Sequence, residues 1–143
     1  MSSARPGSGV PPPFELAVHV RFSDLDGMGH VNHAVFLSYL EEARVAFFKE
    51  RTGKTRVEDY DFILARAEVD YQRPIHLGEE VRIRMWIERI GTKSFTFGYE
   101  LAVGPAVAAK ARTVQVFYDY TKGVSIPIPA PMLTVLERAM REG

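Results

Sequence analysis

The segment of the chain that could do chemistry is a short loop carrying two carboxylates two positions apart, Asp24 and Asp26. Gly27 and Gly29 allow the backbone to turn sharply there, and a helix is predicted to begin just beyond, near Asn32. The first turn of a helix has unpaired N–H groups and partial positive charge, so it can stabilise negative charge developing on a carbonyl oxygen. A carboxylate beside it could attack the carbonyl carbon or activate water. Acidic residues before helices nevertheless form turns and caps more often than active sites.

Two histidines flank the predicted helix start and raise the alternative of a metal site. His30 and His33, with Asp24 and Asp26, supply imidazole and carboxylate groups that zinc or manganese accept as ligands. The two histidines lie on either side of the helix start and do not share a helical face, which argues against one common ion. We therefore predict no metal ion at this loop.

The elements around this loop follow from the spacing of apolar residues. Apolar and polar residues alternate over 14–22, which predicts a strand with one face on a core. Beyond the loop, apolar residues recur at helical spacing until Gly53 supplies a stop, so one long helix with Asn32 as its N-cap is predicted. The apolar positions of this helix are Val35, Phe36, Tyr39, Leu40, Ala43 and Phe47.

Four further strands and a short helix are predicted after the long helix. The strands are expected at about 62–71, 81–88, 94–103 and 107–118, with glycine-containing turns between them, and an amphipathic helix is expected between Pro127 and the C-terminus. This order predicts a single α+β domain, a five-stranded antiparallel sheet wrapped around one long helix. Such a sheet leaves edge strands exposed, so pairing with a second copy is also predicted.

Composition narrows the class of protein. The 143 residues suit one domain, and the Ser-, Gly- and Pro-rich stretch 1–13 is predicted to be a disordered tail before a domain over 14–143. Lys plus Arg and Asp plus Glu each total 18, so no charge excess indicates nucleic acid or an anionic membrane. No apolar run approaches the roughly 20 residues that span a bilayer, so a soluble protein is expected. The absence of cysteine excludes a thiol nucleophile and agrees with a reducing cytoplasm.

The stretch from Arg21 to Arg44 resembles the signature of the 4-hydroxybenzoyl-CoA thioesterase-like branch of the hotdog acyl-CoA thioesterases. Its centre reads Asp24-Leu25-Asp26-Gly27-Met28-Gly29-His30-Val31-Asn32. The similarity continues through 65–71, 73–74, 77–79, Gly91 and 94–96, and it covers nearly everything from residue 14 to about 129. It implies a hotdog fold, active sites formed between two subunits, a dimer that assembles further into a tetramer, and no cofactor.

The resemblance also implies roles for the loop residues. Asp26, the second aspartate of the pattern, is the catalytic carboxylate of the family, and the polarising backbone N–H falls on His33. Asp24 and Gly29 match positions that shape the loop. Asn32 is either a plain N-cap, the more frequent case, or a residue that positions substrate. Asn32 and His33 stand where many relatives have two asparagines, and the role of the His33 imidazole stays open.

Other charged residues are weaker candidates. Glu41, on the long helix, is a reserve base, because some hotdog branches use a helix glutamate in that role. Cations near a sheet rim can contact the phosphates of CoA, although most such residues are ordinary solvated charges. The candidates for this contact are Arg66, Arg73 and Lys93.

The function implied is hydrolysis of an acyl-CoA thioester, with Asp26 as nucleophile or general base. Two alternatives stay open at this point. One is hydrolysis of a thioester carried by acyl carrier protein, and the other is a non-catalytic domain that binds acyl-CoA. Neither the residues nor the resemblance identifies the acyl group.

Overall fold

The structure, a computed structural model, describes residues 13–54 and 61–140. The elements are β1 (Phe14–His19), a 3-10 turn η1 (Phe22–Asp24), α1 (His33–Thr52), β2 (Phe62–Tyr71), β3 (Glu80–Ile90), β4 (Ser94–Val103), β5 (Ala106–Asp119), β6 (Val124–Ser125) and α2 (Ala130–Met140). Five strands lie in the order β1-β3-β4-β5-β2, all neighbours antiparallel, and β6 pairs with the end of β5.

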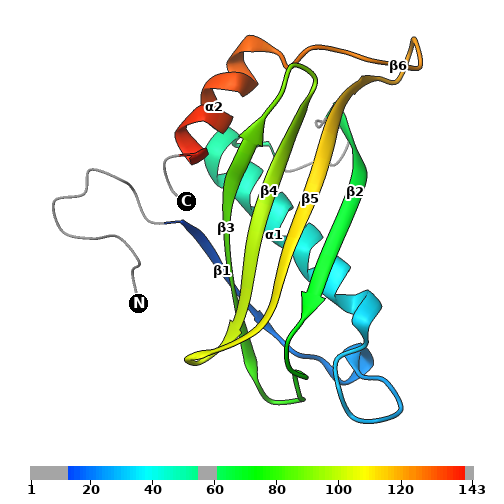
Figure 1. The fold of residues 1–143 in the computed structure, drawn as a ribbon, viewed down its shortest axis with the longest axis vertical. Helices are drawn as coiled ribbons and strands as arrows, with labels where there is room; N and C mark the ends of the chain where they lie inside the picture. Colours follow the sequence, from blue (N-terminus) through cyan, green and yellow to red (C-terminus); the bar gives the residue numbers. More distant parts are fainter. Residues whose placement is uncertain (1–12, 55–60, 141–143) are drawn as a thin grey trace, which may run out of the picture.

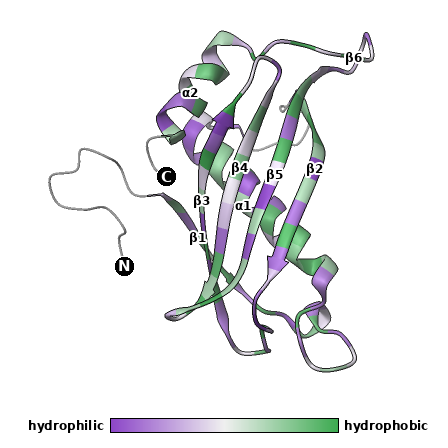
Figure 2. Ribbon diagram, viewed as in Figure 1, coloured by the Kyte–Doolittle hydropathy of each residue, from purple (hydrophilic) through white to green (hydrophobic). Residues whose placement is uncertain are grey.

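Helix α1 lies against one face of the sheet, and the core is the layer between them (Figure 1). Its buried face includes Phe36, Leu40 and Phe47, which recur at the spacing that places side chains on one side of a helix. Phe47 meets Phe97 of β4 edge to face, with ring centroids 5.2 Å apart. In Figure 2 hydrophobic residues, in green, alternate with hydrophilic ones along α1 and the strands. The buried residues of both layers form one core, so burial of aromatic surface holds the helix in place.

The predicted five-stranded sheet is wrong by one strand. Within the described residues the sheet has six, because β6, only two residues long, carries too short a pattern to be seen as a period of two. The strand predicted over 14–22 ends earlier, at His19, because the N–H of Arg21 donates to the Asp24 side chain and is not available to a sheet ladder. The predicted strands 62–71 and 94–103 are confirmed. The predicted tail lies outside the described residues, apart from residue 13.

Strand β2 is the feature of the fold that matters most for a site. It pairs with β5 on one side and forms the sheet edge on the other, and all its residues are half-buried or exposed. Helix α1 contacts β2 through the rings of Phe36 with Tyr71 and of Phe48 with Phe62, but most side chains of β2 between them stay exposed. The end of β2 at Tyr71 reaches the beginning of α1 at His33. An open seam therefore runs between α1 and β2.

Candidate active site

The loop between η1 and α1 folds back on itself through main-chain hydrogen bonds. The N–H of Asp26 donates to the carbonyl of His30 at 2.7 Å, and the N–H of Asn32 donates to the carbonyl of Asp24 at 2.9 Å. Gly29 has φ of 80°, a conformation that side chains disfavour, so glycine suits this turn. The loop thus brings its acidic residues to the first turn of α1.

Asp24 is the buried member of the acidic pair, with 3% of its surface exposed. Its Oδ2 accepts hydrogen bonds from the hydroxyl of Tyr39 at 2.8 Å and the N–H of Arg21 at 2.9 Å. Burial alone would raise the pKa of this carboxyl, but these hydrogen bonds and the Arg21 charge outweigh burial and lower the pKa. Asp24 is therefore an ionised anchor that faces the protein interior.

Asp26 is the exposed member, and its carboxylate is held in a fixed direction. Its Oδ1 accepts from the N–H of Met28 at 2.8 Å and from the N–H of His30 at 3.2 Å. The Met28 hydrogen bond is the main cause that lowers the pKa of Asp26 below its ordinary value of 3.8, helped by the His30 N–H and by His30 and His33 charges. Its Oδ2 has no partner among the described residues, so one carboxylate oxygen is left for a ligand.

The start of α1 presents one free backbone donor beside this carboxylate. The predicted N-cap is confirmed, since the Asn32 side chain accepts from the N–H of Ala34 at 2.8 Å. The N–H of Val35 donates to the Asn32 carbonyl. In the described part of the chain no acceptor is found for the N–H of His33, the first residue of the helix. This N–H is available to an incoming carbonyl oxygen.

An aromatic wall stands next to the helix start. The Tyr71 ring stacks on the His33 imidazole, with centroids 4.2 Å apart and an interplanar angle of 27°, and meets Phe36 edge to face. The Tyr71 hydroxyl donates to the His33 carbonyl at 2.8 Å. Sequence reasoning gave Tyr71 no role, because only the tertiary contact between the end of β2 and the start of α1 brings this ring to the site.

Side chains from the loop, the helix start and the end of β2 line a hollow of about 340 Å³. It is lined by Asp26, His30, Val31, His33, Phe36, Tyr71, Gln72, Arg73 and Pro74. A carboxylate, two imidazoles, a guanidinium and aromatic surface therefore face one concave site at the α1–β2 seam.

The predicted charged residues divide by location. Arg73 lines the hollow, whereas Arg66 lies on β2 with Glu68 as its ion-pair partner at 3.2 Å. Lys93 lies in the β3–β4 turn at the opposite end of the sheet (Figure 1). Glu41 follows His33 by eight residues, which is about 12 Å along the helix axis. Within one chain the structure brings only Arg73 to Asp26.

The alternative of a metal site finds little geometric support. In residues 13–54 and 61–140 no cluster of three or more His, Cys, Asp or Glu side chains is placed to hold an ion. Asp24 points inward to Tyr39, away from the two histidines. The His30 ring instead meets the His76 ring edge to face at 5.1 Å.

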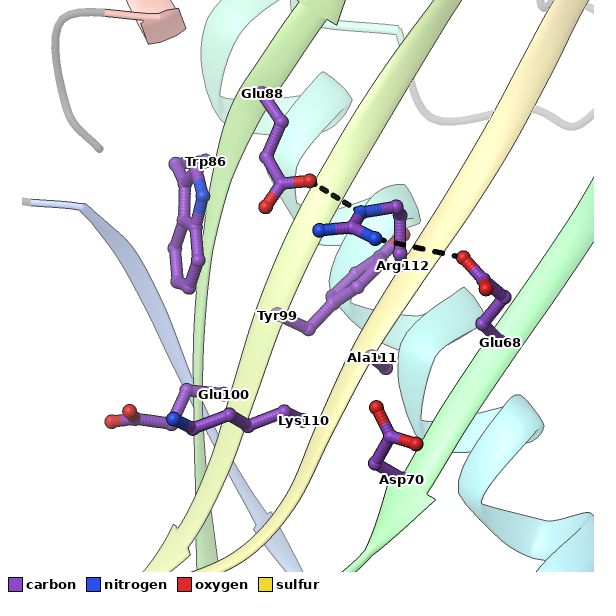
Figure 3. A pocket seen from close by; sticks show the side chains of 9 residues that line it. All are labelled: Glu68, Asp70, Trp86, Glu88, Tyr99, Glu100, Lys110, Ala111 and Arg112. Atoms are coloured by element: carbon purple, nitrogen blue, oxygen red, sulfur yellow. Dashed lines mark hydrogen bonds and ion pairs between the residues drawn. The ribbon is translucent and has the colours of Figure 1, made fainter.

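A second hollow, of about 370 Å³, lies on the outer face of the sheet and contains none of the predicted catalytic residues (Figure 3). Three of its charged side chains bind one another. The Arg112 guanidinium contacts Glu88 at 2.6 Å and Glu68 at 3.7 Å, and these carboxylates raise the Arg112 pKa. These ion pairs join neighbouring strands, so they stabilise this face of the sheet.

Comparison with known proteins gives a consistent result. Residues 20–136 match the Thioesterase-like superfamily. A thioesterase from Thermus thermophilus, solved in complex with coenzyme A and Zn, is 36% identical with a TM-score of 0.80, covering 88% of this chain and 92% of that one. A predicted thioesterase from Bacillus stearothermophilus is 31% identical with a TM-score of 0.82, covering 88% and 95%. A 1,4-dihydroxy-2-naphthoyl-CoA hydrolase from Nostoc punctiforme is 29% identical over 86% of each chain.

None of the helices described has the length and apolar character required to cross a membrane.

Replacing Asp24 by alanine should lower the free energy of unfolding by about 1–3 kcal/mol, because the buried hydroxyl of Tyr39 loses its acceptor. The same change at Asp70, an exposed carboxylate, serves as the matched control and should cost little. Since the folded-state pKa of Asp24 is lowered, its stabilisation is present above about pH 4 and is lost as the pH falls through that pKa. Urea unfolding from pH 7 to pH 3 measures both effects, and an equal loss for the two variants would contradict this role.

Proposed function

The chain belongs to the Thioesterase-like superfamily, and on this premise we propose that it hydrolyses acyl-CoA thioesters to a free acid and CoA at the Asp26 hollow. One observation carries the proposal. An ionised carboxylate with a free oxygen stands beside a helix whose first N–H has no acceptor among the described residues. These are the two groups that attack on a thioester carbonyl requires, a nucleophile or base and a donor for the developing oxyanion.

The geometry supports a simple division of roles. The thioester oxygen binds the His33 N–H, where the N-terminus of α1 favours negative charge. Asp26 then either attacks the carbonyl carbon, expelling the CoA thiolate and leaving an anhydride for water to open, or removes a proton from an attacking water. Both routes use the unpartnered Oδ2, and both require the ionised form that the low pKa ensures. Neither requires a cofactor.

The carrier of the acyl group is proposed to be CoA. Arg73 lines the hollow and also lines a neighbouring one, together with His76 and Glu79. Its guanidinium is therefore placed to contact a phosphate of the CoA arm. Arg66 and Lys93 do not line the hollow, so their contact with CoA stays a prediction. The Thermus relative was solved with coenzyme A, which supports this carrier over acyl carrier protein.

We also propose that the chain forms a homodimer along β2, and that such dimers pair further into a tetramer. The outer edge of β2 has no strand beside it in the described chain, and unpaired edges favour association. Ile63 and Leu64, on the two faces of β2, and Leu37 on α1 are 36%, 48% and 43% exposed, so large apolar side chains stand exposed at this edge. A second copy would cover these side chains and enclose the hollow.

Asp26→Asn should reduce kcat at least about 10²-fold, because the amide neither attacks nor accepts a proton. The assay is thiol release from short, long and aromatic acyl-CoAs and from matched acyl carrier protein thioesters, with Asp70→Asn as the control. Wild-type turnover of the carrier-protein thioesters alone would favour that alternative. Binding of acyl-CoA without any turnover would favour the non-catalytic domain.

The pH profile provides a second readout of the same prediction. The Met28 hydrogen bond lowers the pKa of Asp26 from its ordinary value, so the reactive form persists at neutral and mildly acidic pH and is lost only in acid. Wild-type kcat/KM should therefore show no decrease between pH 8 and pH 5. A falling limb near pH 6.5, the ordinary range of histidine, would assign the essential base to an imidazole.

Two substitutions at His33 distinguish the role of its backbone N–H from the role of its imidazole. His33→Ala keeps the N–H and should keep most activity, whereas His33→Pro removes the N–H and should lower kcat about 10²–10³-fold. Proline is tolerated at the first position of a helix, and Asn32 already has the extended φ and ψ of −58° and 136° that precede proline. Circular dichroism confirms folding of both. Loss of activity in both variants would show that the imidazole takes part.

The β2 interface is tested by Ile63→Lys/Leu64→Lys, which should turn the dimer into monomers in sedimentation velocity, because charge on the seam cannot be buried without cost. Leu77→Lys, at a loop residue that is 51% exposed, is the matched control and should leave the dimer intact. A monomeric wild type, or a dimer unaffected by the double substitution, contradicts this interface.

A further inference from the structure

A third cavity, about 160 Å³ in volume, lies between the middle of α1 and the beginning of β2. It is lined by Glu41, Arg44, Val45, Phe48, Phe62, Leu64, Gln115 and Tyr120, and it shares no lining residue with the Asp26 hollow. Leu64 and Tyr71 are seven residues apart on one strand, which corresponds to about 23 Å. Within one chain the two cavities are separate sites.

Arg44 is the unusual residue in this cavity. Only 9% of its surface is exposed, although arginine is rarely buried without an acidic partner. Within the described residues its one hydrogen bond goes from Nη1 to the Tyr99 hydroxyl at 3.3 Å, and no carboxylate lies within 4.0 Å. Glu41, one turn away on the same helix, is exposed and makes no ion pair with it. Most of the guanidinium donors are therefore unused.

The Tyr99 hydroxyl cannot supply the missing negative charge. It shares a hydrogen bond of 2.6 Å with the Thr113 hydroxyl, and both residues are fully buried. Burial raises the pKa of Tyr99 despite the opposing effect of Arg44, so the phenol stays neutral. Arg44 thus has a neutral acceptor and no counter-charge in the described part of the chain.

A second polar side chain in the cavity wall also lacks a partner. The Nε2 of Gln115 donates to the carbonyls of Phe95 and Thr113, at 3.2 and 3.3 Å. Its Oε1 is buried and accepts no hydrogen bond in the structure described here. Reversing the amide would place Oε1 against two carbonyl oxygens, so the orientation is settled and the acceptor stays unused. One buried acceptor, the Gln115 Oε1, and the Arg44 donors without a partner, which are not among the fully buried atoms, therefore line one cavity.

The rest of the cavity wall is apolar. Phe48 and Phe62 stand with ring centroids 5.3 Å apart, and Val45 and Leu64 complete the hydrophobic side. Apolar cavities of about 150 Å³ accommodate a benzene ring. The cavity therefore combines space for one ring or a short alkyl chain with a buried cation at its wall.

We propose that this cavity is a binding site for a small carboxylic acid, whose carboxylate pairs with the Arg44 guanidinium while its ring or short chain packs on Phe48 and Phe62. Arginine binds carboxylates through two parallel N–H donors, and the pairing is strengthened where water is excluded. The ligand supplies the counter-charge that the described residues lack. The acids that the proposed reaction releases belong to this class, but the site does not depend on that reaction.

The direct test is isothermal titration calorimetry with sodium benzoate and, as a neutral analogue of the same size, benzyl alcohol. Wild-type protein should bind benzoate roughly tenfold or more tightly than benzyl alcohol, and Arg44→Met should remove that preference. Arg82→Met, at an exposed arginine paired with Glu15 on the outer face, is the matched control and should bind as wild type does. Val45→Phe, which fills the cavity and leaves Arg44 in place, should abolish benzoate binding.

The outcomes that overturn the site are equally specific. Unchanged benzoate binding by Arg44→Met and Val45→Phe would place the acid elsewhere, and its loss in Arg73→Met alone would place it in the Asp26 hollow. No binding by the wild type would mean that Arg44 has another partner, such as a carboxylate of a second copy. If Arg44→Met fails to fold, Val45→Phe and the comparison of the two ligands decide the question.

Discussion

The buried Asp24 carboxylate is the contact on which the geometry of the site depends. It joins three parts of the chain. The segment that follows β1 is held through the Arg21 N–H, helix α1 through the Tyr39 hydroxyl, and the loop between them through the backbone of Asp24 itself. A buried anion with too few donors would be costly, so the loop and the helix can adopt few other arrangements. Since the Asp24 carbonyl also accepts the Asn32 N–H, the same residue sets where α1 begins.

With the loop fixed in this way, the second aspartate has a different task. Asp26 is exposed, and two backbone N–H groups orient it without using its second oxygen. Asn32 caps the Ala34 N–H and leaves that of His33 without an acceptor in the described residues. One carboxylate thus stabilises the loop, and the other is held beside a free helix donor. Hydrogen bonds from backbone N–H groups lower the pKa of both carboxyls against the effect of burial, and both are ionised in the pH range where a thioesterase would work.

The sequence predicted those features that depend on local periodicity and on motif. The ranges 62–71 and 94–103 and the N-cap at Asn32 agree with the structure, because alternation and capping chemistry act over a few residues. The end of β1 was predicted too late, since the apolar alternation continues to Phe22 while a side-chain contact has already taken the Arg21 N–H. Tyr71 and Arg44 could not be identified. One acts through a contact across 38 positions, and the other looks in sequence like a polar residue on a solvated helix face.

The two residues that sequence reasoning missed have a common physical origin in the packing of α1. Because the α1 backbone lies nearest β1 and β3, most side chains of the edge strand β2 stay exposed, and side chains from both elements face a seam. Tyr71 closes one end of that seam against the helix start, and Arg44 lies under the helix further along it. Aromatic contacts join α1 to β2 at two places, Phe36 with Tyr71 and Phe48 with Phe62, and a hollow lies beside each of them. The meeting of one helix with an edge strand therefore provides concave, partly polar sites without any element beyond those of the fold.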